Sequence, residues 1–457
     1  MEAKELLRSL PAIDRLLRTD EVRALHERWL PRIVDAELRT FVEELRARIR
    51  DGQLTEAKGT GAASIAAAVG ERLEERLAPG SQRCINATGV VLHTGLGRAV
   101  LPAAARDALQ REVAGYTVVS VDRAKGERIR RETTIAQLLC ALTGAEAATV
   151  VNNNAAATLI ALNTLAGGRE AAISRGQLVE IGGSFRMPDV FRAAHVRLNE
   201  VGTTNRTHLR DFARAIGPDT GLLLRVHPSN FKVVGFTHDV PLEEMVALGR
   251  EHDIPVMDDL GAGALIDLPG EPEIAESLRT GADLVTCSGD KLIGGPQAGI
   301  LLGRSEIIDR VRRNALFRAL RVDKLTLVAL EATVRLFMRP GGPGDDHPTL
   351  RMLHLGEETL KRSAEELRRL LAESGCDVKC VRDMSQVGSG SMPTETLPTW
   401  LVAIAPAKGS ASRLARNLRL GTPPIYTRIV DDRVCLDPRT LQTGEALEIV
   451  RALDELT

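Results

Sequence analysis

The segment Ala282-Asp-Leu-Val-Thr-Cys287 is a short apolar run that ends at Ser288-Gly-Asp-Lys291. Such a run, bounded by turn formers, predicts a buried strand. Lys291 is therefore expected at a strand end and not on a solvated helix face. A lysine held by rigid backbone in a partly dry pocket loses its proton readily and can form a Schiff base. An exposed lysine on a glycine-rich loop fits the same residues, so the rest of the chain must decide.

Short apolar runs alternate with helical patterns on both sides of this segment. Parallel neighbours in a sheet need crossover connections, and strands buried on both faces read as continuous apolar runs. The pattern predicts an α/β fold with a largely parallel, doubly wound sheet. Ligands of such sheets bind beyond the carboxyl ends of the strands, so the polar residues after each run are candidate site residues. The expected strands are 147–151, 170–174, 196–199, 222–226, 254–257, 284–287 and 299–302.

An asparagine-rich segment follows the first expected strand. Asn152-Asn-Asn154-Ala155-Ala156 leads into a helix expected over Leu159 to Leu165. The free N–H groups and the dipole at a helix N-terminus suit a phosphate group. The segment matches neither the P-loop nor the G-x-G-x-x-G pattern, which argues against ATP and NAD as ligands. Asn154, Ala155 and Ala156 are therefore predicted to bind a phosphate.

Other strand ends also carry polar residues. His227 and Asn230 follow the run 222–226, Asp259 follows 254–257, and Ser288 lies where it could reach a phosphate. A buried carboxylate is costly unless it is paired, and Asp259 could pair with a protonated ring nitrogen. Each residue alone fits a turn or a helix cap better than a site. Together, a phosphate loop, a strand-end aspartate and a strand-end lysine predict a pyridoxal 5'-phosphate (PLP) enzyme of fold type I, the aspartate-aminotransferase-like class.

Four arginines are candidates for anion binding. Arg98 lies in a glycine-rich loop and offers a fork of donors to an oxyanion, although a surface arginine without a partner is an equal alternative. Arg318 and Arg321 share a face if the next helix extends back to them, and they would then suit a small oxyanion or an RNA phosphate. A solvated basic turn is equally compatible with them. Arg428 lies where PLP enzymes of this fold often hold a substrate carboxylate.

Composition and breaks in the pattern suggest three domains. A helical module is expected over residues 1–60, a PLP-binding α/β domain over 61–340, and a smaller α+β domain over 341–457. The segment Arg339–Pro348 is rich in proline and glycine and marks the second boundary. Acidic and basic residues nearly cancel in the first module, which therefore reads as solvated helix faces at least as well as an RNA-binding surface.

The overall composition is that of an ordinary folded protein of 457 residues, with 44% hydrophobic and 26% charged residues. The chain has neither a signal-peptide pattern nor an apolar run long enough to span a membrane, so the cytoplasm is expected. Its six scattered cysteines predict reduced core residues and no metal site. The formal net charge of -1 does not indicate a nucleic-acid partner, and it does not exclude one.

The chain as a whole resembles the bacterial L-seryl-tRNA(Sec) selenium transferases, or selenocysteine synthases. The resemblance extends over nearly the whole length, and ordered blocks of this kind are more specific than any single motif. The blocks that carry it are Leu10-Pro-Ala-Ile-Asp-Arg-Leu-Leu17, Asn86-Ala-Thr-Gly89, Val151-Asn-Asn-Asn-Ala-Ala-Ala157, Ser174-Arg-Gly176, Glu200-Val-Gly-Thr-Thr-Asn-Arg206, Ser288-Gly-Asp-Lys-Leu292, Arg318-Ala-Leu-Arg321 and Ser385-Gln-Val-Gly-Ser-Gly-Ser391.

The resemblance implies a function and a set of roles. Lys291 would carry PLP, Asp259 would face the pyridine nitrogen, and Asp290 would be a further catalytic residue. Arg98, Arg318 and Arg321 would hold the selenium donor, selenophosphate. Seryl-tRNA(Sec) would become selenocysteinyl-tRNA(Sec) through a PLP-bound dehydroalanyl intermediate. The N-terminal module would bind the tRNA, and the subunits would form a decamer built from dimers.

Two alternatives use the same residues differently. A PLP-dependent lyase could act on a free small amino acid or amino sugar, and Arg428 favours that reading because an acyl-tRNA has no free carboxylate. The N-terminal module disfavours it. A catalytically silent RNA-binding scaffold on the same fold is the third possibility, and the joint presence of Lys291, Asp259 and the asparagine-rich loop argues against it.

Overall fold

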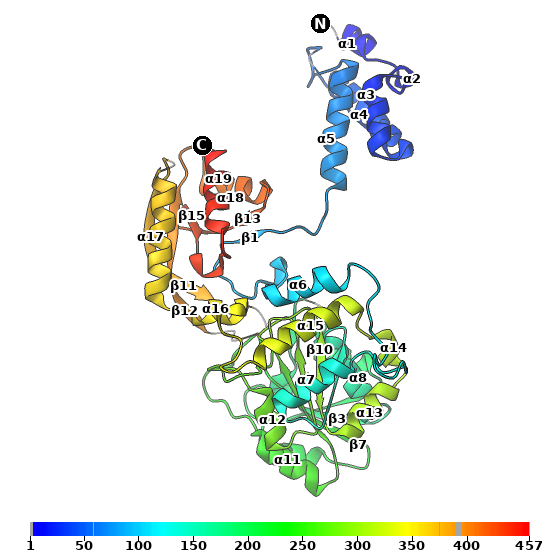
Figure 1. Ribbon diagram of the computed structural model, residues 1–457, viewed down its shortest axis with the longest axis vertical. Coiled ribbons are helices and arrows are strands. Elements are labelled where there is room, and N and C mark those ends of the chain that lie inside the picture. The colour runs from blue at the N-terminus through cyan, green and yellow to red at the C-terminus, as the bar shows by residue number, and fades with distance from the viewer. Residues whose placement is uncertain are drawn as a thin grey trace. The chain divides into compact units, whose positions relative to one another are not determined.

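The computed structural model describes residues 3–57, 59–183, 185–373, 375–388, 391 and 395–456 (Figure 1). The chain divides into two compact units, an N-terminal unit up to Arg83 and a main unit from Cys84 onward. The N-terminal unit therefore extends past residue 60, where the first boundary was expected. Of the expected block Ser385–Ser391, residues 389 and 390 lie outside the described part.

The N-terminal unit is a bundle of helices. Pro31 lies in the first turn of the longest helix, where a missing N–H costs nothing, and Asp51 ends that helix. Its core includes Leu38 and Leu45 on one helix and Val69 on the last, which is why the unit extends past residue 60. The helices are α1 (Ala3–Ser9), α2 (Ile13–Leu16), α3 (Asp20–Arg28), α4 (Pro31–Arg50) and α5 (Ala62–Leu77).

A seven-stranded sheet forms the centre of the main unit, and all seven expected strands are present in it. Its strand order is β2-β10-β9-β8-β7-β3-β6. The strands are parallel except β10, which is antiparallel to both neighbours, as the pairs Gly299↔Ser288 and Gly299↔Val151 show. The strands are β2 (Ala147–Val151), β3 (Glu170–Ser174), β6 (Arg197–Val201), β7 (Thr220–Val226), β8 (Val256–Gly261), β9 (Leu284–Ser288) and β10 (Gly299–Gly303).

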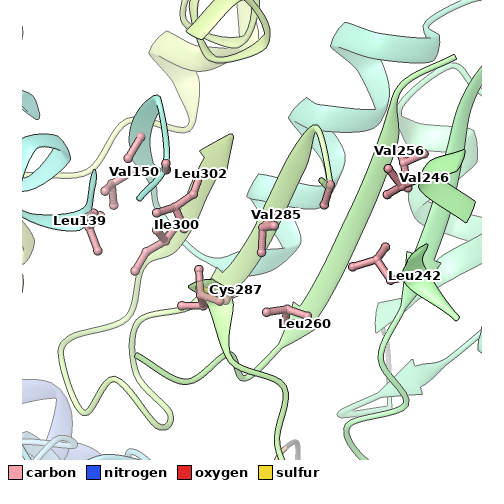
Figure 2. Packing of buried hydrophobic residues seen from close by; sticks show 14 of the residues in the cluster. Leu139, Val150, Leu242, Val246, Val256, Leu260, Val285, Cys287, Ile300 and Leu302 are labelled. Atoms are coloured by element: carbon pink, nitrogen blue, oxygen red, sulfur yellow. The ribbon is translucent and has the colours of Figure 1, made fainter. Parts of the chain in front are cut away.

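Alternate side chains of each strand enter two separate cores, one on each face of the sheet. Figure 2 shows one of them, in which Val150, Val285 and Ile300 pack together. The neighbouring residues Val151 and Leu301 belong to the core on the opposite face. Helices cover both faces, so the prediction of a doubly wound α/β fold is confirmed. On the first face lie α7 (Thr133–Thr143), α11 (Leu242–Glu251), α12 (Ile274–Thr280) and α15 (Lys324–Phe337), and on the second lie α8 (Asn154–Ala166), α9 (Met187–Ala193) and α13 (Ser305–Arg313).

The C-terminal part of the main unit is a four-stranded antiparallel sheet in the order β11-β12-β15-β14, packed against helices. Its strands are β11 (Asp377–Gln386), β12 (Thr396–Ala405), β14 (Arg428–Val430) and β15 (Arg433–Leu436), and its helices are α17 (Glu357–Glu373), α18 (Ala411–Leu420) and α19 (Glu445–Asp454). The remaining elements are β1 (Ile85–Asn86), β4 (Glu180–Ile181), β5 (Phe185–Arg186), β13 (Ile425–Tyr426), α6 (Ala103–Glu112), α10 (Leu209–Ala215), α14 (Leu316–Ala319) and α16 (Pro348–His354).

The start of the main unit is bound to this C-terminal part. β1 pairs in parallel with β13, and the backbone of Val91 and Leu92 bonds to the end of β11 and the residue after it. Gly89 has a positive φ of 77°, and a Cβ atom there would collide with the buried carboxylate of Asp437. The segment that leads to Arg98 is therefore fixed before it reaches the central sheet.

Within the described residues, no helix is long and apolar enough to cross a membrane. The same residues contain no group of three or more His, Cys, Asp or Glu side chains that could hold a metal ion. All six cysteines are free thiols.

Candidate active site

A cavity of about 270 Å³ lies at the carboxyl ends of β7, β8 and β9 and at the N-terminus of α8. This is the edge of the sheet at which doubly wound folds bind ligands. Eight of the thirteen residues predicted for the site line it: Arg98, Asn154, Ala155, His227, Asp259, Ser288, Asp290 and Lys291.

Lys291 lies in the turn after β9 and is 6% exposed. Burial lowers the pKa of its amine, and the positive charge of Arg98 lowers it further, while Asp290 and Asp259 act in the opposite direction. A lowered pKa increases the neutral fraction of the amine, which is the form that acts as a nucleophile or a base. The environment of Lys291 thus suits covalent and proton-transfer chemistry.

Arg98 and Asp290 form an ion pair next to this lysine. Arg98 Nη1 donates to Asp290 Oδ2 at 2.6 Å, and the backbone N–H of Ala99 donates to the carbonyl oxygen of Asp290. Arg98 has a φ of 64°, a left-handed conformation that is uncommon for residues other than glycine and that often marks functional sites. The arginine has a partner, so the alternative of a surface arginine without a partner is wrong.

Both carboxylate oxygens of Asp259 are fixed by donors from α8 and from its own strand. Asn154 Nδ2 donates to Oδ1 and the Thr158 hydroxyl donates to Oδ2, each at 2.8 Å, and the N–H of Gly261 also reaches Oδ1. These donors hold the carboxylate of Asp259 in a fixed orientation. Asp258, the neighbouring residue, points to the other face, where it pairs with Arg225 and accepts from Ser277.

The N-terminus of α8 lies at the cavity beside Asp259. The side chain of Asn153 caps this helix by accepting from the N–H of Ala156 at 2.8 Å. Asn154 and Ala155, which supply the two earlier N–H groups of the first turn, line the cavity. Such groups have no acceptor within a helix, so they are available to an anion.

Two buried polar atoms in the described part of the cavity lack a hydrogen-bond partner, which supports the presence of a polar ligand. Among the described residues, Asn154 Oδ1 and Ser229 Oγ are buried and have no hydrogen-bond partner. Buried polar atoms are normally satisfied, and exceptions at a cavity are consistent with a bound group. The amine of Lys291, the carboxylate of Asp259, the helix N-terminus and these atoms together fit the aldehyde, ring nitrogen and phosphate of PLP.

His227 and a set of apolar side chains complete the walls. Burial lowers the pKa of His227 to about 4, and the charges of Arg225 and Lys291 add to the effect. His227 is therefore neutral at physiological pH and offers a flat ring without charge. The apolar side chains come from the hairpin of β4 and β5 and its flanks, and they are Val179, Ile181, Phe185 and Met187.

Five predicted site residues lie outside the residues that line this cavity. The N–H of Ala156 is taken by Asn153, and Asn230 donates to the carbonyl oxygen of Glu180. Arg428 pairs with the buried carboxylate of Asp437 at 3.2 Å. Its guanidinium therefore has a structural partner, which explains how an arginine can stand at this position without a substrate carboxylate. The other two are Arg318 and Arg321.

Arg318 and Arg321 are not on one helix, because α15 begins at Lys324 with Asp323 as its cap. Arg321 forms a backbone bridge with Val151, and the carbonyl of Leu320 accepts from Asn152. The pair is thus tied to the asparagine-rich loop through the backbone. A third arginine, Arg131, lies close enough that the charges of Arg321 and Arg318 add to burial in lowering its pKa.

Sequence reasoning missed several residues at the site. Thr158 lies one helical turn after Asn154 on α8. The sequence alone does not show that this face of the helix meets Asp259. Ser229 lies between His227 and Asn230, which are both predicted site residues. Phe185 lies on β5, where no motif points to it, and Gln297 lies in the same loop as Lys291 but carries no signal of its own.

The fold and the cavity define the class: a fold type I, PLP-dependent α/β enzyme. A solved structure of D-glucosaminate-6-phosphate ammonia-lyase is similar in fold, with a TM-score of 0.56 and 21% sequence identity over 84% of this chain and 97% of that one. The family model for L-seryl-tRNA selenium transferase matches residues 84–442. The chain belongs to the L-seryl-tRNA(Sec) selenium transferase family.

Full-length relatives support the assignment. The chain is 47% identical to the L-seryl-tRNA(Sec) selenium transferase of Moorella thermoacetica, over 99% of this chain and 97% of that protein. It is 46% identical to the enzyme of the same name from Geobacter sulfurreducens and 44% identical to that of Desulfomicrobium baculatum, over 98% of each chain in both cases. These alignments include the N-terminal unit, which the family model does not reach.

Proposed function

We propose that this protein converts seryl-tRNA(Sec) to selenocysteinyl-tRNA(Sec), with PLP as its cofactor and selenophosphate as the selenium donor. Family membership supports the reaction. The observation that carries it to this chain is Lys291, a buried lysine with a lowered pKa at the end of β9, opposite an aspartate whose two oxygens are both held by donors.

The cavity residues divide between the parts of the cofactor. Lys291 Nζ would attach PLP, Asp259 would pair with its ring nitrogen, and the N–H groups of Asn154 and Ala155, with Ser288, would bind its phosphate. His227 supplies a neutral surface for the ring. When bound, PLP supplies an electron sink at Cα of the seryl group.

Proton transfer is then the task of Lys291. With a substrate bound, the neutral Nζ of Lys291 would take the Cα proton, and the same atom would return a proton at the end of the reaction. Asp290 holds the Arg98 guanidinium beside this amine, which keeps a positive charge near Nζ and favours its neutral form. The β-hydroxyl leaves as water, the selenium–phosphorus bond of the donor breaks, and the phosphoryl group passes to water as inorganic phosphate. Selenium keeps its oxidation state, so the reaction requires no oxidant or reductant.

The arginines supply the charge that a phosphorylated donor needs. Arg98 lines the cavity, and we assign it to the donor's oxyanion together with Arg318 and Arg321, which lie next to the asparagine-rich loop. Arg428 is assigned a structural role instead, because its guanidinium already pairs with the carboxylate of Asp437. This also weakens the case for a lyase acting on free amino acids, which drew on Arg428.

We assign tRNA binding to the N-terminal unit, with the enzyme in the cytoplasm as a homo-oligomer. Most charges of α5 are paired with α4 or α3, including Arg72 with Glu44 and Arg28 with Glu74. Arg32 and Arg39 are exposed on α4 and are two turns apart, so they face one side of the helix. Replacing both by Glu is expected to weaken tRNA(Sec) binding without affecting PLP content.

The function is tested by incubating the purified protein with PLP, seryl-tRNA(Sec) and selenophosphate and assaying for selenocysteinyl-tRNA(Sec). Lys291→Ala is the control, and it is expected to abolish both the visible absorbance of bound PLP and the conversion. Turnover of a free amino acid without any affinity for tRNA(Sec) would instead select the lyase. A colourless wild-type protein that still binds tRNA would indicate a silent scaffold.

A further inference from the structure

His347 is a fully buried histidine whose two ring nitrogens are both hydrogen bonded. Nδ1 lies 3.1 Å from the backbone N of Leu350, and Nε2 lies 2.8 Å from the carbonyl oxygen of Ile293. The backbone N–H can only donate and the carbonyl can only accept. The partners therefore define the neutral tautomer with the proton on Nε2.

The first of these bonds belongs to a helix cap. His347 is the N-cap of α16, and its Nδ1 takes the place of the usual serine or aspartate oxygen. The second bond leaves this helix and reaches Ile293, two residues after Lys291. One side chain thus joins the start of α16 to the turn that carries the lysine.

The turn packs directly against the imidazole. Gly294 has a φ of 69°, and a Cβ atom built on it would collide with the His347 ring. The N–H of Gly294 donates to the carbonyl oxygen of Lys291, and the N–H of Gly295 donates to that of Gly289. These bonds close the turn on itself, and the imidazole supports it from outside.

The surroundings hold the ring in place and exclude water. Phe337 meets the imidazole edge-on, with ring centroids 5.3 Å apart. Phe337, Leu350 and Leu292 belong to one buried apolar cluster. Burial lowers the pKa of His347, in agreement with the neutral form that its partners require.

We propose that His347 is a positioning residue for Lys291: its Nε2–H holds the Ile293 carbonyl and thereby fixes the direction in which the Lys291 side chain leaves the turn. The proposal rests on the role of Lys291 in the proposed function. It assigns no contact between His347 and substrate or cofactor, because the ring reaches the site only through the backbone of the turn.

Two substitutions each keep one of the two hydrogen bonds of His347 and remove the other. His347→Asn keeps a short acceptor near Nδ1 and can still cap α16, but it has no donor that reaches Ile293. His347→Gln places an amide N–H near Nε2 and can still donate to Ile293, but it is poorly suited to the cap. Both variants are expected to lower the thermal unfolding midpoint, so stability alone does not distinguish a positioning role.

The first decisive measurement uses cofactor-free protein. Amide hydrogen exchange of the peptide spanning residues 289–298 is expected to be faster in His347→Asn than in His347→Gln. In the PLP-bound protein, the pH midpoint of the visible absorbance is expected to shift in the Asn variant alone. Its kcat should fall by about tenfold or more while the KM for seryl-tRNA(Sec) is retained.

Equal exchange, spectra and kcat in the two variants would overturn the proposal. If the Asn variant does not fold, Gly294→Ala takes its place, because its added Cβ pushes the turn away from the imidazole; an unshifted spectrum there would also overturn it. The exchange and absorbance readouts need no tRNA. A wild-type protein that binds PLP but does not convert seryl-tRNA(Sec) therefore refutes the proposed function separately.

Discussion

Nη1 of Arg98 lies 2.6 Å from Oδ2 of Asp290, the residue directly before Lys291. The pair joins a loop at the start of the main unit to the turn after β9, although nearly two hundred positions separate them in the sequence. The carboxylate favours a charged lysine and the guanidinium favours a neutral one. The arginine therefore sets the protonation of Lys291 as well as offering donors to an anion.

Arg98→Ala is expected to raise the pKa of Lys291, because it removes a positive charge and leaves Asp290 without its partner. The pH profile of kcat should move to higher pH, and kcat/KM at neutral pH should fall by about 10- to 100-fold, as for the loss of a charged hydrogen bond. Arg98→Lys retains the charge and should retain most of the profile. An unshifted profile in the Ala variant would contradict this role.

Asp258 and Asp259 form a matched pair for testing the cofactor site. Asp259→Asn is expected to lower kcat by at least about 100-fold, or about 2.7 kcal/mol, because the ring nitrogen loses its ionised partner. Asp258→Asn breaks a buried ion pair with Arg225 on the other face and should destabilise the fold by about 3 kcal/mol. Activity per folded, PLP-loaded subunit measures the kinetic effect, and urea unfolding measures the effect on stability. Similar kinetics in both variants would count against the assignment of Asp259 to the ring nitrogen.

The lowered pKa of His227 predicts that the free energy of unfolding depends on pH. Its pKa is about 4 in the folded protein, below its usual value of 6.5, so between these pH values the unfolded chain binds more protons. The contribution of neutral His227 to the free energy of unfolding is fully present above pH 6.5. It is lost as the pH falls toward 4, by up to about 3 kcal/mol. His227→Gln should unfold with a smaller loss of stability between pH 7 and pH 5. Parallel curves for the two proteins would exclude the effect.

Gly89→Ala tests the attachment of the first strand to the C-terminal sheet. The added Cβ would meet the Asp437 carboxylate, which also accepts from Ser385, Thr399 and Arg428. We expect a loss of about 3 kcal/mol or more, because a buried charged network must move. Gly444→Ala is the control, since it has a similar positive φ but open space around it, and backbone strain alone costs about 1 kcal/mol. Denaturant unfolding of both variants measures the difference.

The fold was predictable because its strands are buried on both faces. The run 299–302 is apolar throughout, and 222–226 is apolar except for Arg225. Only a central sheet with helices on both sides buries such segments. Their direction was not predictable: an apolar run reads the same in either orientation, and nothing in Gly299–Gly303 indicated that β10 is antiparallel. The boundary at Arg83 was missed because α5 is attached to the N-terminal unit by packing and not by a sequence signal.

The site was predictable where it depends on strand ends and not where it depends on partners. Lys291, Asp259 and His227 lie at or just beyond the carboxyl ends of strands, so the geometry of a parallel sheet brings them together. The donor from Thr158 and the pairing of Arg428 with Asp437 are contacts between distant segments, and a single sequence does not show them. The expected shared face of Arg318 and Arg321 failed because a cap at Asp323 starts the helix after them.

The antiparallel direction of β10 determines how the reactive lysine is tethered. In a parallel arrangement the chain after β9 would leave this edge of the sheet through a helix and return from the opposite side. Here Ser288 and Gly299 are paired across the antiparallel ladder of β9 and β10, so the segment between them is a loop with both ends fixed to adjacent strands. Insertions in that loop would loosen the lysine without unfolding the sheet. A backbone cut after Lys291 would leave the lysine covalently connected to β9 alone.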